Sequence, residues 1–146
     1  MISRHMVQRW MAGVCLLVVV PSSTLAATQA EERTLACAEA LRLDGLVPYH
    51  QATLENGILD LSFGRNAVWG RWKLALKDVH VAAPSEEAGF FILKITCRNE
   101  QTCIQAGEME TFSSRQASHF MPFKTAAEAD RAYQQIISRQ RACNVS

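Results

Sequence analysis

The 146-residue sequence lacks an excess of charge of either sign, because it holds 15 lysine and arginine residues and 14 aspartate and glutamate residues. Proteins that bind nucleic acid through its phosphates carry clustered positive charge. A near-neutral chain has no such electrostatic footprint. We therefore expect no nucleic-acid partner.

The sequence also lacks an apolar run long enough to cross a membrane. Residues 11–20 are almost wholly apolar, but Pro21 interrupts them at about half the roughly 20 residues that a membrane-spanning helix needs. We therefore expect a protein that does not span the membrane once its N-terminus has been processed.

The N-terminus has the composition of a secretory signal peptide. Arg4 and Arg9 precede the apolar run, and small residues follow it where a signal peptidase reads the chain. Thr24 and Ala26 fit the two recognition positions, so we predict cleavage after Ala26, with cleavage after Ala27 as the alternative. An uncleaved membrane anchor is the competing interpretation, and the short apolar run argues against it.

Removal of the predicted signal, residues 1–26, changes both the charge and the cysteine count. It takes away two arginines and no acidic residue, so 15 basic and 14 acidic residues become 13 and 14. It also takes away Cys15, one of five cysteines. We expect residues 27–146 to form a single exported domain, periplasmic or secreted, whose even number of cysteines forms disulfides.

Four cysteines allow three pairings. Cys97 and Cys103 flank a short polar stretch that can turn a hairpin, so they can meet locally. Cys37 would then pair with Cys143 and tie the beginning of the domain to its end. A zinc site is the rival interpretation, but the sequence has no Cys-x-x-Cys pair, which also argues against redox activity.

Strand patterns fill the middle of the chain. Asn56-Gly57 favours a two-residue type I′ turn, in a register that pairs His50 with Phe63 and gathers apolar side chains on one face. Alternating apolar residues predict further strands at 68–76, 79–81, 90–97, around 104 and at 119–123, with a bulge at 77–78.

Polar segments separate these strands. We predict a disordered lead at residues 27–33, and a short helix or turn that passes into a strand at 34–43. We predict loops at 82–88 and 107–118.

The end of the chain has the clearest helix signal. Thr125 and Glu128 stand at capping-box spacing, and apolar residues recur at helical spacing from Ala129 to Cys143. Several antiparallel strands followed by one amphipathic helix make an α+β fold. We expect an antiparallel sheet or partly open barrel of about six to seven strands closed by this helix.

This element order, with Phe120-x-x-Phe123 leading into the capped helix, resembles a pleckstrin-homology-like barrel over most of residues 45–142. The resemblance implies the fold only. The lipid-headgroup binding of some such domains does not carry over, because the sequence has no Lys/Arg-rich first hairpin.

Candidate catalytic and metal-binding residues are few. His50, His80 and His119 fall on three different predicted strands, so we expect no metal and no other cofactor. Ser113 and Ser114 near His119 are the best available nucleophiles, but they lack the strand–turn–helix context of a serine hydrolase. We therefore expect that the protein is not an enzyme.

Apolar side chains that point away from the core are more informative. Phe90 and Ile92 alternate with inward-facing residues, and Trp69 is out of phase with its neighbours unless Gly70 marks a bulge. Either the C-terminal helix covers these side chains, or they form a patch with basic neighbours, which is typical of a protein-binding site. The predicted partner-binding residues are Trp69, Arg71, Lys73, Phe90, Ile92 and Lys94.

The leading hypothesis is therefore an exported, non-enzymatic binding protein that docks a protein partner in the cell envelope, as inhibitor and immunity proteins do. The alternative is a small-ligand or lipid carrier that uses the barrel interior or a cleft under the C-terminal helix. A third hypothesis is a small hydrolase that uses His119 or His50.

Overall fold

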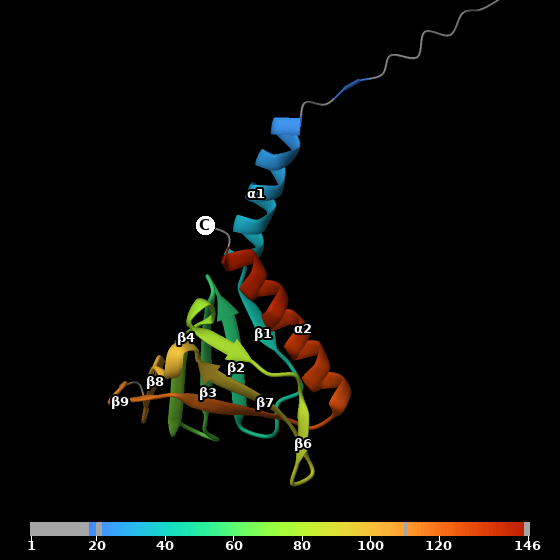
Figure 1. Cartoon of the computed structure of the whole chain (residues 1–146). Helices are drawn as coiled ribbons and strands as arrows, with labels where there is room; N and C mark the ends of the chain where they lie inside the picture. Colours follow the sequence, from blue (N-terminus) through green and yellow to red (C-terminus); the bar gives the residue numbers. More distant parts are fainter. Residues whose placement is uncertain (1–17, 20–21, 110, 145–146) are drawn as a thin grey trace, which may run out of the picture.

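The computed structural model describes residues 18–19, 22–109 and 111–144, so most of the predicted signal peptide lies outside the described residues. Within them, two helices and ten strands make an α+β fold, as the sequence predicts (Figure 1). The elements are α1 (Ser22–Ala38), β1 (Leu41–Leu43), β2 (His50–Glu55), β3 (Ile58–Phe63), β4 (Gly70–Ala75), β5 (Val79–Val81), β6 (Ser85–Glu87), β7 (Phe90–Cys97), β8 (Ile104–Gly107), β9 (Ser114–Gln116), β10 (Ser118–Phe123) and α2 (Ala126–Cys143).

The strands form two antiparallel sheets. The larger sheet has the order β1-β2-β3-β4-β8-β9, and the smaller has the order β10-β7-β5, with β6 also paired to β7. Ala117 alone separates β9 from β10, so nearly continuous chain passes from one sheet to the other and forms a corner. A single bridge between Leu46 and Phe123 joins the chain after β1 to the end of β10. Within the described residues the sheets do not close into a barrel.

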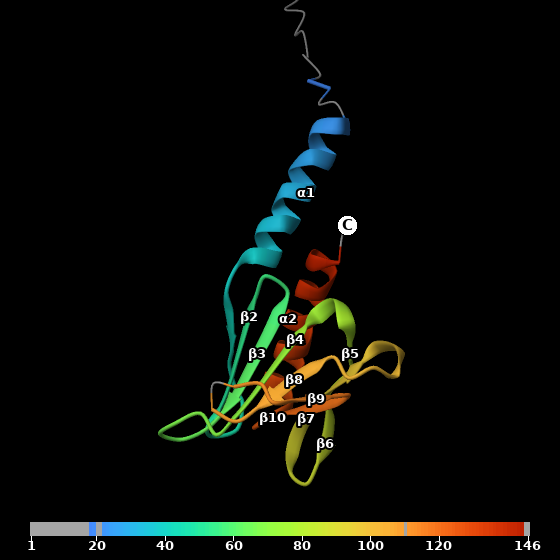
Figure 2. The same ribbon diagram turned by 90° about the vertical axis from the view of Figure 1, so that its left-hand side faces the viewer.

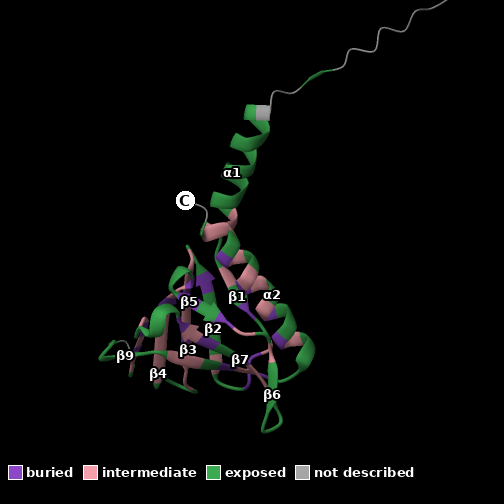
Figure 3. Ribbon diagram, in the orientation of Figure 1, coloured by how far each residue is buried: buried purple, intermediate pink, exposed green. Residues whose placement is uncertain are grey.

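One hydrophobic core lies between the two sheets and α2. Its fully buried members include Leu59 from the larger sheet, Leu93 and Ile95 from the smaller sheet, and Ile136 from α2. Buried residues of the strands and of α2 are purple in Figure 3. Each such side chain contributes roughly 1.5–3 kcal/mol through burial of apolar surface. Because every strand alternates, the residues between these point away from the core on the outer side of each sheet.

The β2–β3 hairpin has the register that the sequence predicts. Asn56 and Gly57 have φ values of 51° and 73°, as a type I′ turn requires. His50 pairs with Phe63, and the pairing runs without a break to Glu55 opposite Ile58. The alternation of apolar and polar residues and the turn residues therefore specify the same register.

Helix α2 begins at the predicted capping box. The Thr125 side chain accepts a hydrogen bond from the backbone N–H of Glu128, and its hydroxyl donates to the Glu128 carboxylate. The apolar pattern did not identify Gln140, which is nevertheless buried beneath this helix. Its amide nitrogen donates to the carbonyl oxygens of Leu76 and Val79, at 2.6 and 2.8 Å.

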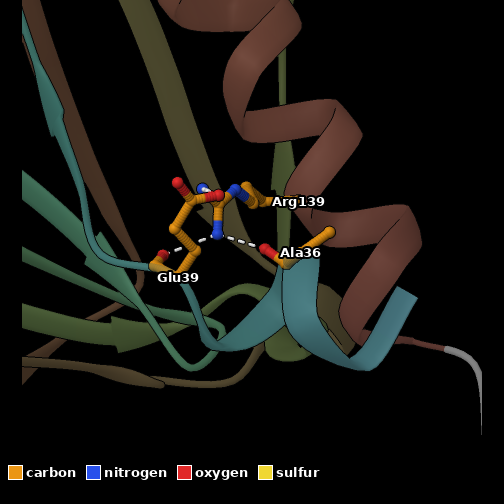
Figure 4. Close-up of polar contacts among 3 residues, drawn as sticks. All are labelled: Ala36, Glu39 and Arg139. Atoms are coloured by element: carbon orange, nitrogen blue, oxygen red, sulfur yellow. Dashed lines mark hydrogen bonds and ion pairs between the residues drawn. The ribbon is translucent and has the colours of Figure 1, made fainter. Parts of the chain in front are cut away.

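Helix α1 corrects the prediction of a disordered lead at residues 27–33. This segment is helical and largely exposed, and α1 projects away from both sheets (Figure 2). Arg139 of α2 donates hydrogen bonds to the backbone oxygens of Ala36 and Glu39, where α1 ends (Figure 4). A cation at the C-terminus of a helix satisfies otherwise unpaired carbonyls and complements the helix dipole.

Both predicted cysteine pairs are confirmed. The sulfur atoms of Cys37 and Cys143 lie 2.09 Å apart, and those of Cys97 and Cys103 lie 2.12 Å apart. The first pair joins the end of α1 to the end of α2. The second pair does not close a β-hairpin, because β7 and β8 belong to different sheets. It instead staples the short connection that carries the chain between the sheets.

Three other local predictions are wrong. Residues 82–88 contain strand β6, which returns to β7 through Ala88 and Gly89, both with positive φ. The sequence signal was missing because alanine is uncommon in such a turn. Residues 107–118 contain strand β9, which pairs with β8. In place of the bulge at 77–78 there is a single 3₁₀ turn, Leu76–Asp78.

Candidate functional site

The outer side of the smaller sheet carries a contiguous apolar surface. Phe90 and Ile92 point outward from β7, and Phe120 and Pro122 point outward from the neighbouring strand β10. Pro122 pairs with Ile92, which places these two side chains side by side between Phe90 and Phe120. We call these four residues the outer apolar face. Its two phenylalanines are 46% and 47% exposed, so neither belongs to the core.

Charged residues border the outer apolar face. Lys94 pairs with Phe120 across the two strands, and its ammonium nitrogen lies 5.9 Å from the centre of the Phe120 ring. At this distance the cation is attracted to the face of the ring. On the other side, Glu87 of β6 pairs with Phe90. The surface thus has Ile92 and Pro122 at its centre and a phenylalanine toward each end, with Lys94 beside Phe120 and Glu87 beside Phe90.

The structure divides the predicted partner-binding residues among three places. Phe90, Ile92 and Lys94 lie together on the outer side of the smaller sheet. Arg71 and Lys73 lie on β4, on the outer side of the larger sheet, beyond the shared core. Arg71 forms an ion pair there with Asp60 at 2.5 Å.

Trp69 occupies a third position, at the entry to β4. It is 55% exposed, and its ring meets that of Phe63 edge to face, with 5.6 Å between ring centres. The possibility that the C-terminal helix covers the outward aromatic residues is therefore resolved for Trp69 and Phe90, since both remain exposed.

Two of the three histidines in the described part of the chain belong to an aromatic cluster at the same end of the sheets. His119 stacks on Trp72 with 4.2 Å between ring centres, and His50 lies 4.7 Å from Phe63. Burial lowers the pKa of His119 to about 4, with a smaller contribution from the charge of His50. His119 is therefore a neutral imidazole at neutral pH.

A groove of about 570 Å³ opens beside this cluster. Phe63, Trp69 and Trp72 line one part of it, and polar residues of β9 and of the loop before it line another. We call it the aromatic groove. Sequence reasoning missed it because its two walls come from segments more than 30 residues apart in the chain, and only the β4–β8–β9 pairing brings them together.

The remaining candidate groups do not form a catalytic or metal-binding arrangement. Within the part of the chain that the structure describes, no three histidine, cysteine or acidic side chains gather as metal ligands. Ser114 donates to the backbone oxygen of Ala106 at 3.4 Å, and His50 donates to that of Pro48 at 3.2 Å. Among the described residues, neither His50 nor His119 hydrogen-bonds to a serine hydroxyl.

Phe120 and Pro122 are the residues of the outer apolar face that sequence reasoning missed. The signal was present, because Phe120 and Pro122 alternate with the buried residues Met121 and Phe123.

None of the described helices is both long and apolar enough to cross a membrane. Comparison of the sequence with protein-family models and with curated proteins finds no match.

Proposed function

We propose that this protein is an exported, non-enzymatic binding protein that docks a protein partner in the cell envelope, in the manner of an inhibitor or immunity protein. The observation that carries the proposal is the outer apolar face, on which Phe90 and Phe120 remain about half exposed on adjacent strands. Exposed aromatic residues grouped on one surface are typical of protein-binding hot spots.

The border of the face indicates the chemistry of the partner. Burial of both phenylalanine rings requires an apolar depression on the partner's surface. Lys94 holds a positive charge beside the Phe120 ring, so an acidic side chain at the rim of that depression would add complementary charge. The predicted signal peptide and the two disulfides support a location in the periplasm or outside the cell.

The carrier alternative has less support. Buried side chains from both sheets and from α2 meet in one cluster, so they occupy the interior that a carrier would use for its ligand. The aromatic groove lies outside this interior.

The test is capture of a partner from an envelope extract of the native organism, followed by its identification and by affinity measurement with purified components. We expect F90A and F120A each to weaken binding of the identified partner by at least about tenfold, because truncation of a hot-spot aromatic costs about 2 kcal/mol or more. The free energy of unfolding of each variant should lie within about 1 kcal/mol of that of the parent, since neither ring is part of the core.

F112A is the matched control. Phe112 is also an exposed phenylalanine and lies near a cation, Arg71, but on the other side of the molecule. Its removal should leave partner affinity unchanged. Equal affinity of F90A, F120A and the parent would contradict the proposal. Self-association that F90A and F120A both abolish would show instead that this face joins two copies of the chain.

A further inference from the structure

The aromatic groove lies on the core-facing side of the larger sheet, at a place that the smaller sheet does not cover. Trp72 pairs with Ala106, and Ala106 pairs with Ser114, so the three side chains share one row across β4, β8 and β9. Ala106 is buried, whereas Ser114 at the end of the row is exposed. The inner surface of the sheet therefore opens to solvent along β9.

Polar residues occupy core-facing positions in this strand. Gln116 pairs with Ile104, which is completely buried, yet Gln116 itself is exposed and lines the groove. Ser114, two residues earlier, points to the same side. A hydrophilic strand on the inner face of a sheet departs from the usual pattern of apolar residues facing inward. Such departures are expected at functional sites, including ligand-binding sites.

Aromatic rings form the opposite wall. Trp69 offers an indole that is more than half exposed, and Phe63 and Trp72 stand beside it. A Cβ atom on Gly70 would lie 2.7 Å from the Trp72 ring, so the lack of a side chain at position 70 leaves room for this ring. The stacked His119 supports Trp72 from the neighbouring sheet.

The charges that line the groove limit the classes of ligand that it can bind. Among the described residues that line it, Glu108 alone carries a charge, and no lysine or arginine does. The described lining of the groove therefore offers no cation to pair with a phosphate or a carboxylate. Its hydroxyl and amide groups instead match the hydroxyl groups of an uncharged ligand, which they can serve as both donors and acceptors.

We propose that the aromatic groove binds a neutral saccharide. One sugar ring stacks its C–H face on the indole of Trp69, because the weakly positive C–H groups are attracted to the negative face of an aromatic ring. The hydroxyl groups of the sugar hydrogen-bond to Ser114, Gln116 and Glu108. This site is separate from the outer apolar face, so it stands independently of the proposed protein partner.

The test uses the fluorescence of the two tryptophans in the groove. The chain has three tryptophans, and W10F removes the only other one. The full chain carrying W10F is titrated with triacetylchitotriose, maltotriose and cellotriose, and with choline as a cationic probe. We expect a saturable change in emission with at least one trisaccharide at concentrations below about 10 mM, the weak end of specific binding.

Variants then locate the binding, measured by calorimetry so that loss of a fluorophore does not matter. We expect W69A to weaken saccharide affinity at least about tenfold and Q116A to weaken it severalfold, while F90A on the outer apolar face leaves it unchanged. If W69A fails to fold, the saccharide affinities of Q116A and S114A still test the proposal. The proposal is overturned if no trisaccharide gives a saturable signal, if only choline does, or if the groove variants that fold bind as the parent does.

Discussion

Replacement of Gln140 by leucine should destabilise the protein by about 2 kcal/mol. The Gln140 side chain lies beneath α2 and donates to the carbonyl oxygens of Leu76 and Val79, so it ties the helix to the turn between β4 and β5. Leucine has a similar volume and removes both hydrogen bonds, each of which contributes about 1 kcal/mol net.

The loss should not reach the larger penalty of two orphaned carbonyl groups. The Leu76 oxygen also accepts from the backbone N–H of Val79, and the Val79 oxygen also accepts from the Arg98 guanidinium at 3.0 Å. Both acceptors therefore keep a donor in the variant. Glutamate at position 140 should cost more, about 3 kcal/mol or more at neutral pH, because its carboxylate would be buried against two carbonyl oxygens.

Urea or thermal unfolding measures these differences. For a domain of this size, a loss of about 2 kcal/mol corresponds to a fall of about 6–12 °C in Tm. Q134L is the matched control, because Gln134 lies on the exposed side of the same helix and its replacement should change stability by no more than about 0.5 kcal/mol. A Q140L protein as stable as the Q134L protein would refute the reasoning, as would a Q140E protein that is no less stable than Q140L.

The two disulfides should contribute unequally, because the 106-residue separation of Cys37 and Cys143 restricts the unfolded chain more than the 6-residue separation of Cys97 and Cys103. On the chain-entropy model, replacing both cysteines of the first pair by serine lowers the free energy of unfolding by about 5 kcal/mol, and the same change in the second pair lowers it by about 2 kcal/mol. Denaturant melts will distinguish these losses, and equal losses would contradict the model. The pKa of His119 is about 4 in the folded protein and 6.5 in the unfolded chain, so on acidification the unfolded chain binds the proton first. His119 therefore leaves the free energy of unfolding independent of pH above about pH 6.5, and lowers it as the pH falls toward 4. Over that interval we expect the free energy of unfolding of H119F to fall by about 3 kcal/mol less than that of the parent, measured by melts at a series of pH values. An unchanged pH profile would show that His119 is not the group responsible.

The sequence alone determined the features that depend on neighbouring residues. The Asn56-Gly57 turn specified its hairpin because only residues that tolerate positive φ suit a type I′ turn, and the alternation of side chains allowed one register. The capping box at Thr125 located the start of α2 for a similar reason, since its hydrogen bonds are made within a single turn. The parity and spacing of the cysteines indicated both disulfides.

Only the tertiary structure decided how distant segments meet. Strand β8 pairs with β4 and not with the preceding strand β7, so Cys97 and Cys103 staple a crossing between sheets where the polar stretch predicted a hairpin. The same arrangement separates Arg71 from Lys94, although both are outward-facing basic residues on strands. It also brings Gln116 opposite Trp69 across a groove. Periodicity shows which side of a strand is apolar, but it does not show which strands are neighbours, because that choice depends on how the whole chain buries its core.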